Sequence, residues 1–389
     1  MNILGICGAI GWDGNIPYGL GDLEDFWVHG SGATLVINGE LKTALTEERF
    51  SRIKYDGNYP KLAVQKILDH NKLTKYDIDL VVYVGSTCKI SFELLRARYV
   101  EDKLREYFPN SEQQFLYHHI AHSAATFYTS GFEEANVLTF DGAGDFELQP
   151  DGVYCIPHMK FSQGTDLTLT EIISYYNGMG AMHTGFGNLY NSYAFSAYNN
   201  KLNISEEDLK DAAIHRETYP GKVMGLAAYG DYQKINDLPE WFSLEREKQQ
   251  HSSMGWEECL PQLCNNGSTE GHILNPDFTT SQSEDLAAWS QYQFEKYLLL
   301  FLSNIPKHIK RDNLCLGGGC ALNIIANTKI LEQGIYKNVH VNTAPNDDGL
   351  HFGAALFMAA RLENKIILPD DIGYLGIPYT DEDIEAALC

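Results

Sequence analysis

Short apolar runs in the first third of the chain predict strands that alternate with helices. Residues 2–6 and 80–84 are continuous hydrophobic runs, which indicates strands. The segments 60–70 and 91–106 are predicted to be helices on either side of the second run. This alternation is typical of an α/β protein.

A tight hairpin follows the first predicted strand. Residues 33–37 and 40–45 are two strand-like runs separated by Asn38-Gly39. This dipeptide readily supplies the two positive φ angles of a two-residue turn, so the two runs are expected to pair with each other.

Strand and helix units return in the last third of the chain. A long helix is predicted over 283–308, followed by strands at 313–316 and 339–341 and helices at 321–332 and 349–363. The intervening residues are polar, rich in Gly and Asn, and less regular. We therefore expect a first lobe at 1–170, an insertion of mostly helix and loop at 171–282, a second lobe at 283–370, and a linker or docking segment at 371–389.

One predicted strand in each half of the chain ends in a glycine-rich turn. Residues 137–140 run into a turn that contains Gly142 and Gly144, and residues 313–316 run into the turn 317–319. Exposed backbone N–H groups in such turns can hold phosphate, although many glycine turns are only tight turns. Two of them, one in each half, suggest the two-lobed, duplicated ribonuclease H-like fold of the actin-like ATPases, with nucleotide between the lobes.

Composition and charge narrow the function. The chain has 389 residues, 44% of them hydrophobic, and a formal net charge of −23, which argues against non-specific nucleic-acid binding. Its longest apolar run, 297–302, is too short to span a membrane, and the N-terminus lacks the basic region of a signal peptide. The 8 cysteines show no Cys-x-x-Cys spacing, so we expect free thiols and a cytoplasmic location.

A histidine pair is the strongest chemical signal in the sequence. A helix is expected to start near His118. His122 lies four residues later, so both side chains would project from the same face of this helix. Two imidazoles so placed can share a metal ion, and Asp141, at the end of a predicted strand, is a suitable third ligand. The alternative for the pair alone is a helix with surface histidines.

An ordered set of motifs resembles a known family. The set comprises the runs 46–52, 118–122, 138–142, 223–230, 316–323 and 345–349, with 353–355 after them. In this order they resemble the O-carbamoyltransferases of nodulation-factor and antibiotic biosynthesis. The resemblance extends over nearly the whole chain.

The resemblance implies a reaction and its cofactors. In that family a C-terminal domain converts carbamoyl phosphate and ATP into carbamoyl-adenylate, and the actin-like domain passes the carbamoyl group to a substrate hydroxyl. A metal assists, with Fe²⁺ favoured and Mn²⁺, Mg²⁺ or Zn²⁺ as alternatives. By motif match, the metal ligands are His118, His122, Asp141 and Asp347. The residues expected to line ATP or the adenylate are Gly142, Gly144, Lys222, Gly225, Gly317, Gly318, Gly319 and Asn323.

The expected catalytic residues lie near the N-terminus. Glu47, Arg49 and Arg52 belong to a dense charge cluster that is either a solvated edge or an anchor for acceptor or phosphate. His29 is a candidate general base for the acceptor hydroxyl, but the aspartate that follows this histidine in the family is replaced here by Gly30.

The resemblance also predicts a partner. The adenylating domain of the family would begin near Cys389, so we expect a separate protein to supply it. The acceptor is expected to be a sugar, an aminoglycoside-like compound, or a hydroxymethylated nucleobase or nucleotide, and a homodimer is one option. Two alternatives stay open: a tRNA threonylcarbamoyl transferase-like enzyme and a non-catalytic nucleotide-binding regulator.

Overall fold

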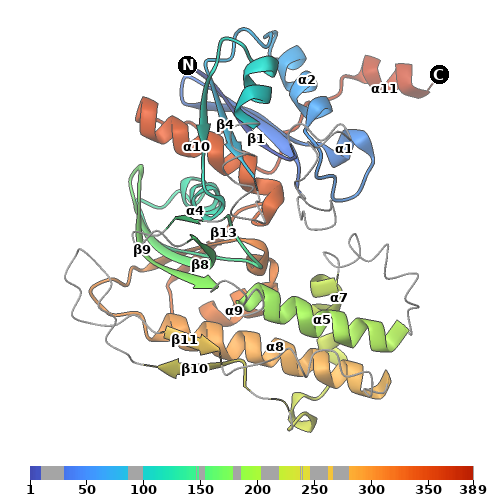
Figure 1. The fold of residues 1–389 in the computed structure, drawn as a ribbon, viewed down its shortest axis with the longest axis vertical. Helices are drawn as coiled ribbons and strands as arrows, with labels where there is room; N and C mark the ends of the chain where they lie inside the picture. Colours follow the sequence, from blue (N-terminus) through green and yellow to red (C-terminus); the bar gives the residue numbers. More distant parts are fainter. Residues whose placement is uncertain are drawn as a thin grey trace. The chain divides into compact units, whose positions relative to one another are not determined.

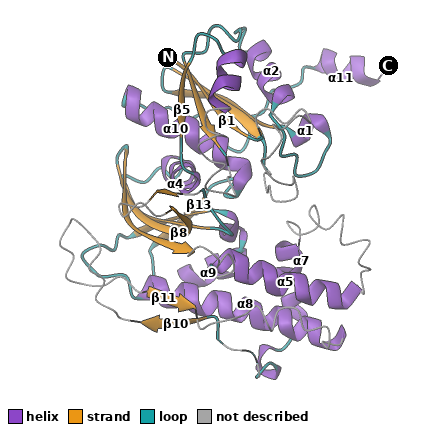
Figure 2. Ribbon diagram, viewed as in Figure 1, coloured by secondary structure: helices purple, strands orange, loops and turns teal. Residues whose placement is uncertain are grey.

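The computed structural model describes most of the chain as two compact units. The described residues are 1–9, 30–85, 100–145, 147–148, 154–177, 185–202, 219–236, 238, 240–245, 262–265 and 280–388. Unit 1 comprises Met1–Gly131, Thr165–Leu169 and Asn342–Cys389. Unit 2 comprises Phe132–Gly164 and Thr170–Val341. Each unit is built on its own mixed sheet (Figures 1 and 2).

The sheet of unit 1 has five strands in the order β3-β2-β1-β4-β5. Strand β1 pairs antiparallel with β2 and parallel with β4, and β4 pairs parallel with β5. The strands are β1 (Asn2–Cys7), β2 (Gly32–Ile37), β3 (Glu40–Thr46), β4 (Leu80–Val84) and β5 (Glu112–Phe115).

The local predictions for this sheet are confirmed. Strand β4 is buried along its whole length, as its unbroken apolar sequence indicates. The hairpin between β2 and β3 turns at Asn38 and Gly39, whose φ angles are 52° and 76°. Strand β5 was not predicted, because its sequence is mostly polar and three of its four residues are exposed.

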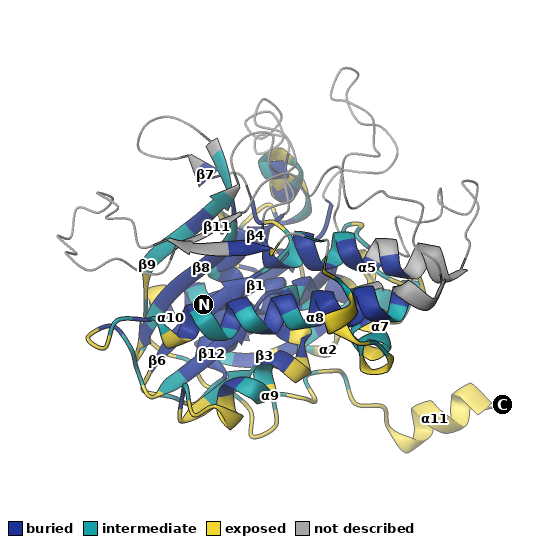
Figure 3. Cartoon of the chain, turned by 90° about the horizontal axis from the view of Figure 1, so that it is seen from below, coloured by how far each residue is buried: buried dark blue, intermediate teal, exposed yellow. Residues whose placement is uncertain are grey.

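Helices of unit 1 pack on this sheet or carry the candidate site. Helix α10 packs against β1, β2 and β4 and also against α4, and ten of its residues are buried. Helix α11 has no buried residue (Figure 3). The helical segments are α1 (Glu48–Ser51), α2 (Lys61–His70), 100–107, α4 (His118–Tyr128), the 3₁₀ turn η7 (Asp347–Gly349), α10 (Leu350–Glu363) and α11 (Asp381–Leu388).

The sheet of unit 2 has the strand order β13-β12-β6-β8-β7, with β9 paired to β8. Strand β12 lies parallel to β6 on one side and to β13 on the other. The strands are β6 (Glu134–Phe140), β7 (Glu147–Leu148), β8 (Tyr154–Thr165), β9 (Thr168–Asn177), β12 (Asn313–Gly317) and β13 (Asn338–Val341).

An aromatic core joins this sheet to the helices of unit 2. Helix α5 packs against α7 and α8, and Phe140 at the end of β6 contacts Phe186 of α5 and Phe294 of α8. The remaining elements are α5 (Phe186–Leu202), α7 (Tyr219–Leu226), η3 (Ala227–Tyr229), η4 (Tyr232–Lys234), β10 (Phe242–Glu245), β11 (Gln262–Asn265), α8 (Thr280–Ser303), η6 (Gly319–Leu322) and α9 (Ile324–Glu332).

Two helix boundaries differ from the sequence prediction for identifiable reasons. Helix α8 ends at Ser303 rather than at 308, because Pro306 disfavours helical geometry in the residue before it. The predicted helix 321–332 begins as the 3₁₀ turn η6, and α9 starts after Asn323, whose side chain caps it by accepting a hydrogen bond from the Ala326 amide.

The chain passes from unit 1 to unit 2 between Leu169 and Thr170, beside the predicted boundary at 170, and returns to unit 1 at Asn342. The predicted boundaries at 282 and 370 stay a prediction. Helix α10 near the C-terminus packs on the first sheet, and β6 pairs with β12 across a long stretch of sequence. The described part of 171–282 contains helices α5 and α7 together with strands β10 and β11 and most of β9. Among the described residues, no helix combines the length and apolar character that a bilayer crossing requires. Cys320 is a buried free thiol.

Candidate metal centre

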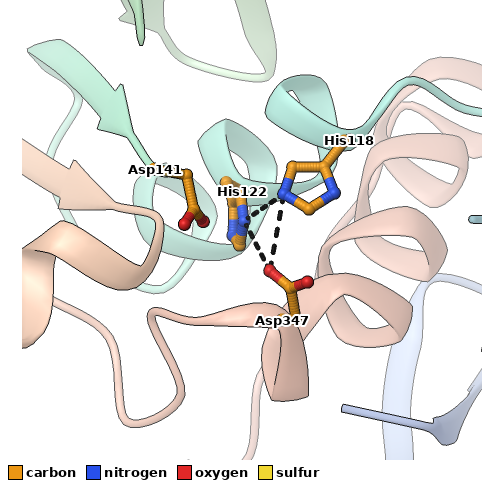
Figure 4. A group of neighbouring side chains, drawn as sticks. All are labelled: His118, His122, Asp141 and Asp347. Carbon is orange, nitrogen blue, oxygen red and sulfur yellow. Dashed lines mark hydrogen bonds and ion pairs between the residues drawn. The ribbon is translucent and has the colours of Figure 1, made fainter. Parts of the chain in front are cut away.

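Helix α4 places the two predicted histidines on one buried face. The helix starts at His118 after an extended Tyr117, so His118 and His122 lie one turn apart. Both side chains are almost fully buried, at 2% and 1% exposure, which rules out the surface-histidine alternative. Their ring centroids lie 4.6 Å apart and their Nε2 atoms 3.0 Å apart (Figure 4).

Asp347 brings a carboxylate to the same two nitrogen atoms. It begins the 3₁₀ turn η7, which leads directly into α10. Its Oδ1 lies 3.4 Å from the Nε2 of His118 and 3.4 Å from the Nε2 of His122 (Figure 4). The side chain of Asp347 is 11% exposed. Unit 1 by itself therefore gathers two nitrogens and one oxygen at a single buried point.

The spacing of these three atoms fits one metal ion. With metal–ligand distances of about 2.1 Å, ligand atoms lie about 3.4 Å apart in a tetrahedral site and about 3.0 Å apart in an octahedral one. The separations observed here are 3.0 Å and 3.4 Å. Imidazole nitrogen and carboxylate oxygen are donors that suit Fe²⁺, Mn²⁺ or Zn²⁺. The residues present therefore fit the divalent ion that the sequence predicts.

Asp141, the fourth predicted ligand, belongs to unit 2 and has partners there. Its Oδ1 accepts a hydrogen bond from the Gly142 amide at 2.7 Å, and its Oδ2 accepts one from the Gly319 amide at 2.8 Å. Its own amide donates to the His158 carbonyl at 2.9 Å. The carboxylate thus joins the two glycine turns that the sequence analysis singled out. In this structure it accepts hydrogen bonds from two of the backbone amides that were expected to bind phosphate.

Gly318 lies where the two parallel strands β6 and β12 end. Its φ is +88°, and an added Cβ would meet the carbonyl of Phe140. Glycine is therefore required both for its backbone conformation and for the close approach of the two strands. Gly317 is buried in β12, and the Gly144 amide donates to the Pro157 carbonyl at 2.8 Å.

The start of α5 also contacts the Asp141–Gly142 turn, which the sequence analysis missed. Asn188 donates from Nδ2 to the Gly142 carbonyl at 2.6 Å, and an added Cβ on Gly187 would lie 2.6 Å from the carbonyl carbon of Asp141. The only local signal was the Gly187-Asn188 dipeptide, which was assigned to a polar insertion. These residues fix the backbone that carries Asp141.

The other predicted nucleotide residues differ in their surroundings. Asn323 is buried and exchanges hydrogen bonds of 3.0 Å with Gln291. The oxygen and the nitrogen of its side-chain amide are therefore both already used in the packing of α8 on α9. Lys222 and Gly225 lie exposed on α7, and an added Cβ on Gly225 would meet no atom within 4 Å. The binding role of all three stays a prediction.

The charge cluster after β3 contains the buried Glu47, the half-buried Glu48 and two exposed arginines. Both carboxylate oxygens of Glu47 accept hydrogen bonds from the first turn of α2, from the amides of Leu62 at 3.0 Å and Ala63 at 2.7 Å. Burial raises the pKa of Glu47, against the lowering effect of these two bonds. Arg49 and Arg52 are exposed. Glu47 thus caps a helix here, and the catalytic role predicted for these three residues stays a prediction.

His29 lies outside the described residues. The neighbouring Gly30 has a φ of +72°, and an added Cβ there would lie 2.7 Å from the Asp348 amide nitrogen. The Gly30 position that departs from the family pattern is therefore packed against the turn that bears Asp347.

Comparison with known structures supports the predicted fold. The crystal structure of T. kodakarensis HypF matches 94% of this chain and 48% of its own, with a TM-score of 0.50 and 13% sequence identity. At this identity the match shows the fold alone, which is the α/β fold of the actin-like ATPase type that the glycine turns suggested.

Sequence relatives cover most of the chain. Nodulation protein NolNO of Sinorhizobium fredii is 29% identical over 366 residues, which are 88% of this chain and 48% of that protein. The uncharacterized protein sll1178 of Synechocystis is 26% identical over 407 residues, 93% of this chain and 61% of that protein. The chain thus spans about half the length of these curated relatives.

The family model for the carbamoyltransferase N-terminus matches residues 104–356. This match includes both histidines, both aspartates and both glycine turns of the candidate site. The chain therefore belongs to the carbamoyltransferase family.

Proposed function

We propose that this chain transfers a carbamoyl group from carbamoyl-adenylate to a hydroxyl of a small polar acceptor, with the help of a divalent metal ion. The observation that carries the proposal is the convergence of His118, His122 and Asp347, whose donor atoms lie 3.0 to 3.4 Å apart. Family membership supplies the type of group that is transferred.

We propose Asp141 of unit 2 as a fourth ligand. Its carboxylate is held by the amides of Gly142 and Gly319, and such outer-shell hydrogen bonds orient a metal ligand and favour its charged form. When bound, the ion would act as a Lewis acid on the acyl oxygen or on the phosphate of the leaving group. Fe²⁺ is our first choice, with Mn²⁺, Mg²⁺ and Zn²⁺ as alternatives.

The glycine turns would then serve two purposes. The amides of Gly142 and Gly319 hold Asp141, so we propose that the nucleotide contacts the rest of the turn 317–319, whose path depends on the positive φ of Gly318. ATP itself or the AMP portion of carbamoyl-adenylate would bind there. Lys222 and Gly225 of α7 are proposed as further contacts because α7 belongs to the same unit.

The acceptor would be bound mainly by unit 1. Arg49 and Arg52 are exposed, while Glu47 is used to cap α2 and Glu48 lies 3.8 Å from the Arg49 guanidinium, so two guanidinium groups of the segment 47–52 face solvent. Guanidinium groups bind hydroxyl-rich or phosphorylated molecules through paired hydrogen bonds. Sugars, aminoglycoside-like compounds and hydroxymethylated nucleobases or nucleotides remain the proposed acceptors, and His29 remains the proposed base.

The transfer step balances without any further reagent. The acceptor oxygen would attack the carbamoyl carbon, the bond from that carbon to the phosphate oxygen would break, and AMP would leave while a base takes the hydroxyl proton. Because its relatives are longer than this chain, we propose that a further domain or a separate protein makes carbamoyl-adenylate from carbamoyl phosphate and ATP.

The experiment supplies purified chain with synthetic carbamoyl-adenylate, Fe²⁺ and a panel of hydroxyl acceptors, and follows carbamoylated product by mass spectrometry. We expect product with carbamoyl-adenylate and none with carbamoyl phosphate and ATP alone. Product from carbamoyl phosphate and ATP would overturn the proposed need for a partner. If the chain binds nucleotide and metal but transfers nothing to any acceptor, the non-catalytic alternative replaces the proposal.

A further inference from the structure

Helix α10 links the two elements that carry the metal ligands of unit 1. It continues directly from η7, which bears Asp347, and it packs on α4, which bears the histidine pair. At Gly353 the two helices touch through their backbones, since an added Cβ would lie 3.0 Å from the Ala125 nitrogen and closer still to the Ala121 carbonyl oxygen. The position of α10 therefore sets the separation between the aspartate and the histidines.

The same helix lies directly on the backbone of the sheet. An added Cβ on Gly5 of β1 would lie 3.0 Å from the nitrogen of Ala355 and would overlap the carbonyl of His351. Figure 1 shows α10 running alongside β1 in unit 1. Gly5 has no side chain to separate α10 from β1. The distance between α10 and the sheet therefore depends on the few side chains that point into this contact.

His351 is one of those side chains. It is 2% exposed, and its Nδ1 lies 2.7 Å from the Thr34 hydroxyl of β2. Gly32, two residues earlier on the same face of β2, leaves the space that the ring occupies, because an added Cβ there would overlap Nε2. The imidazole is thus fitted between Thr34 and Gly32, one helical turn after Asp347.

The ring also contacts the turn that carries the ligand. Burial lowers the pKa of His351 to about 3, and a hydrogen bond to the Asp348 backbone only partly offsets that fall. The ring is therefore neutral at ordinary pH. On its other side the Asp347–Asp348 backbone is bounded by Gly30, whose added Cβ would lie 2.6 Å from the Asp347 carbonyl carbon. The aspartate backbone has little freedom to shift.

We infer that His351 is a positioning residue for the metal centre: by fitting between Thr34 and Gly32 it fixes η7, and so fixes the Asp347 carboxylate opposite the histidine pair. The inference rests on the proposed metal site. Metal–ligand distances are held within about 0.2 Å in well-formed sites, so a small displacement of η7 matters. His351 itself touches no ion in this account.

The test measures Co²⁺ binding to the full chain by titration of the visible absorption of the ion. The variants are His351→Ala, His351→Asn and Thr34→Val, with Leu356→Ala as the matched control. Leu356 is a fully buried residue of the same helix, farther from η7. The melting temperature is recorded in chelator for every variant, so that lost stability and lost metal affinity are separated.

His351→Ala should bind Co²⁺ about 10- to 100-fold more weakly, the range seen when groups behind a ligand are removed, and its absorption spectrum should change. His351→Asn should recover part of the affinity, because its amide nitrogen can replace Nδ1. Leu356→Ala should lose stability but keep wild-type affinity and spectrum.

Wild-type affinity and spectrum in His351→Ala would overturn the inference. If His351→Ala does not fold, Thr34→Val provides the test, since it keeps the imidazole of His351 and removes only the hydroxyl that bonds to it. Unchanged Co²⁺ binding by Thr34→Val would then contradict the inference. A wild-type chain that binds no Co²⁺, or a His118→Ala variant that binds it normally, overturns the proposed metal site together with this inference. If wild type binds Co²⁺ and His118→Ala does not, a negative result for the His351 variants contradicts only the role of His351.

Discussion

Replacing Gly353 with alanine should weaken metal binding without altering any ligand. An added Cβ at this position would lie 1.9 Å from the Ala121 carbonyl oxygen of α4 and 3.0 Å from the Ala125 nitrogen. Ordinary contacts between such atoms are at least about 3.4 Å, and both neighbours belong to helix backbone, so α10 and α4 must move apart by roughly 1 Å or more. His118 and His122 move with α4, whereas Asp347 moves with α10.

Two magnitudes follow from this displacement. Overpacking of a buried contact costs about 1–3 kcal/mol, which corresponds to a melting temperature lower by roughly 2–12 °C for a unit of about 150–250 residues. A ligand displaced by roughly 1 Å lies well outside the about 0.2 Å tolerance of a metal site, so metal affinity should fall more than about tenfold.

The assay compares Gly353→Ala with Gly221→Ala. Gly221 lies in helix α7, and an added Cβ there would meet no atom within 4 Å, so the control makes the same substitution in open space. The melting temperature in chelator reports the stability of the metal-free protein, and metal titration gives its metal affinity. The control should be as stable as wild type or slightly more so, because alanine favours helix. A Gly353→Ala protein with wild-type stability and metal affinity would refute the reasoning.

Three further predictions concern single residues. His118→Ala should lose more than about tenfold in metal affinity, while His119→Ala, a buried histidine of the same helix outside the ligand set, should retain metal on elemental analysis; equal metal content in the two variants would contradict the ligand assignment. Gly318→Val should abolish the rise in melting temperature that ATP gives wild type, because a side chain there would clash with the Phe140 carbonyl and displace the turn 317–319; full stabilisation by ATP would show that nucleotide binds elsewhere. Glu47→Gln should remove one contribution to the pH dependence of stability. The raised pKa of Glu47 favours the folded state fully below the unfolded value of about 4.5, and this contribution is lost as pH rises through the folded pKa. Urea unfolding from pH 4 upward should therefore show wild type losing stability relative to the variant, and a constant difference would contradict the raised pKa.

Features that depend on neighbouring residues were predictable from the sequence. Unbroken apolar runs predicted β1 and β4, and the Asn38-Gly39 dipeptide predicted the first hairpin. The four-residue spacing predicted that His118 and His122 lie on one face of a helix. Each of these properties arises within a few residues of chain, where periodicity and turn chemistry act.

Other features depend on contacts between distant residues. Asp347 carries no local signal and was identified only through the family resemblance, because its closeness to His118 comes from the packing of α10 on α4. The long hairpin of β8 and β9 was missed because β8 contains Pro157 and Gly164 and lacks a regular apolar alternation. The capping role of Glu47 was likewise invisible, since α2 begins 14 residues later at Lys61.

The most direct test of the central claim measures carbamoyl transfer against metal occupancy. Chain freed of metal by chelation is reconstituted with increasing Fe²⁺ under anaerobic conditions, and the initial rate of transfer from carbamoyl-adenylate is followed with one accepted hydroxyl substrate. We expect a rate that rises in proportion to bound ion up to one ion per chain, and no rise for His118→Ala. Metal-free chain that transfers the carbamoyl group as fast as reconstituted chain would contradict it.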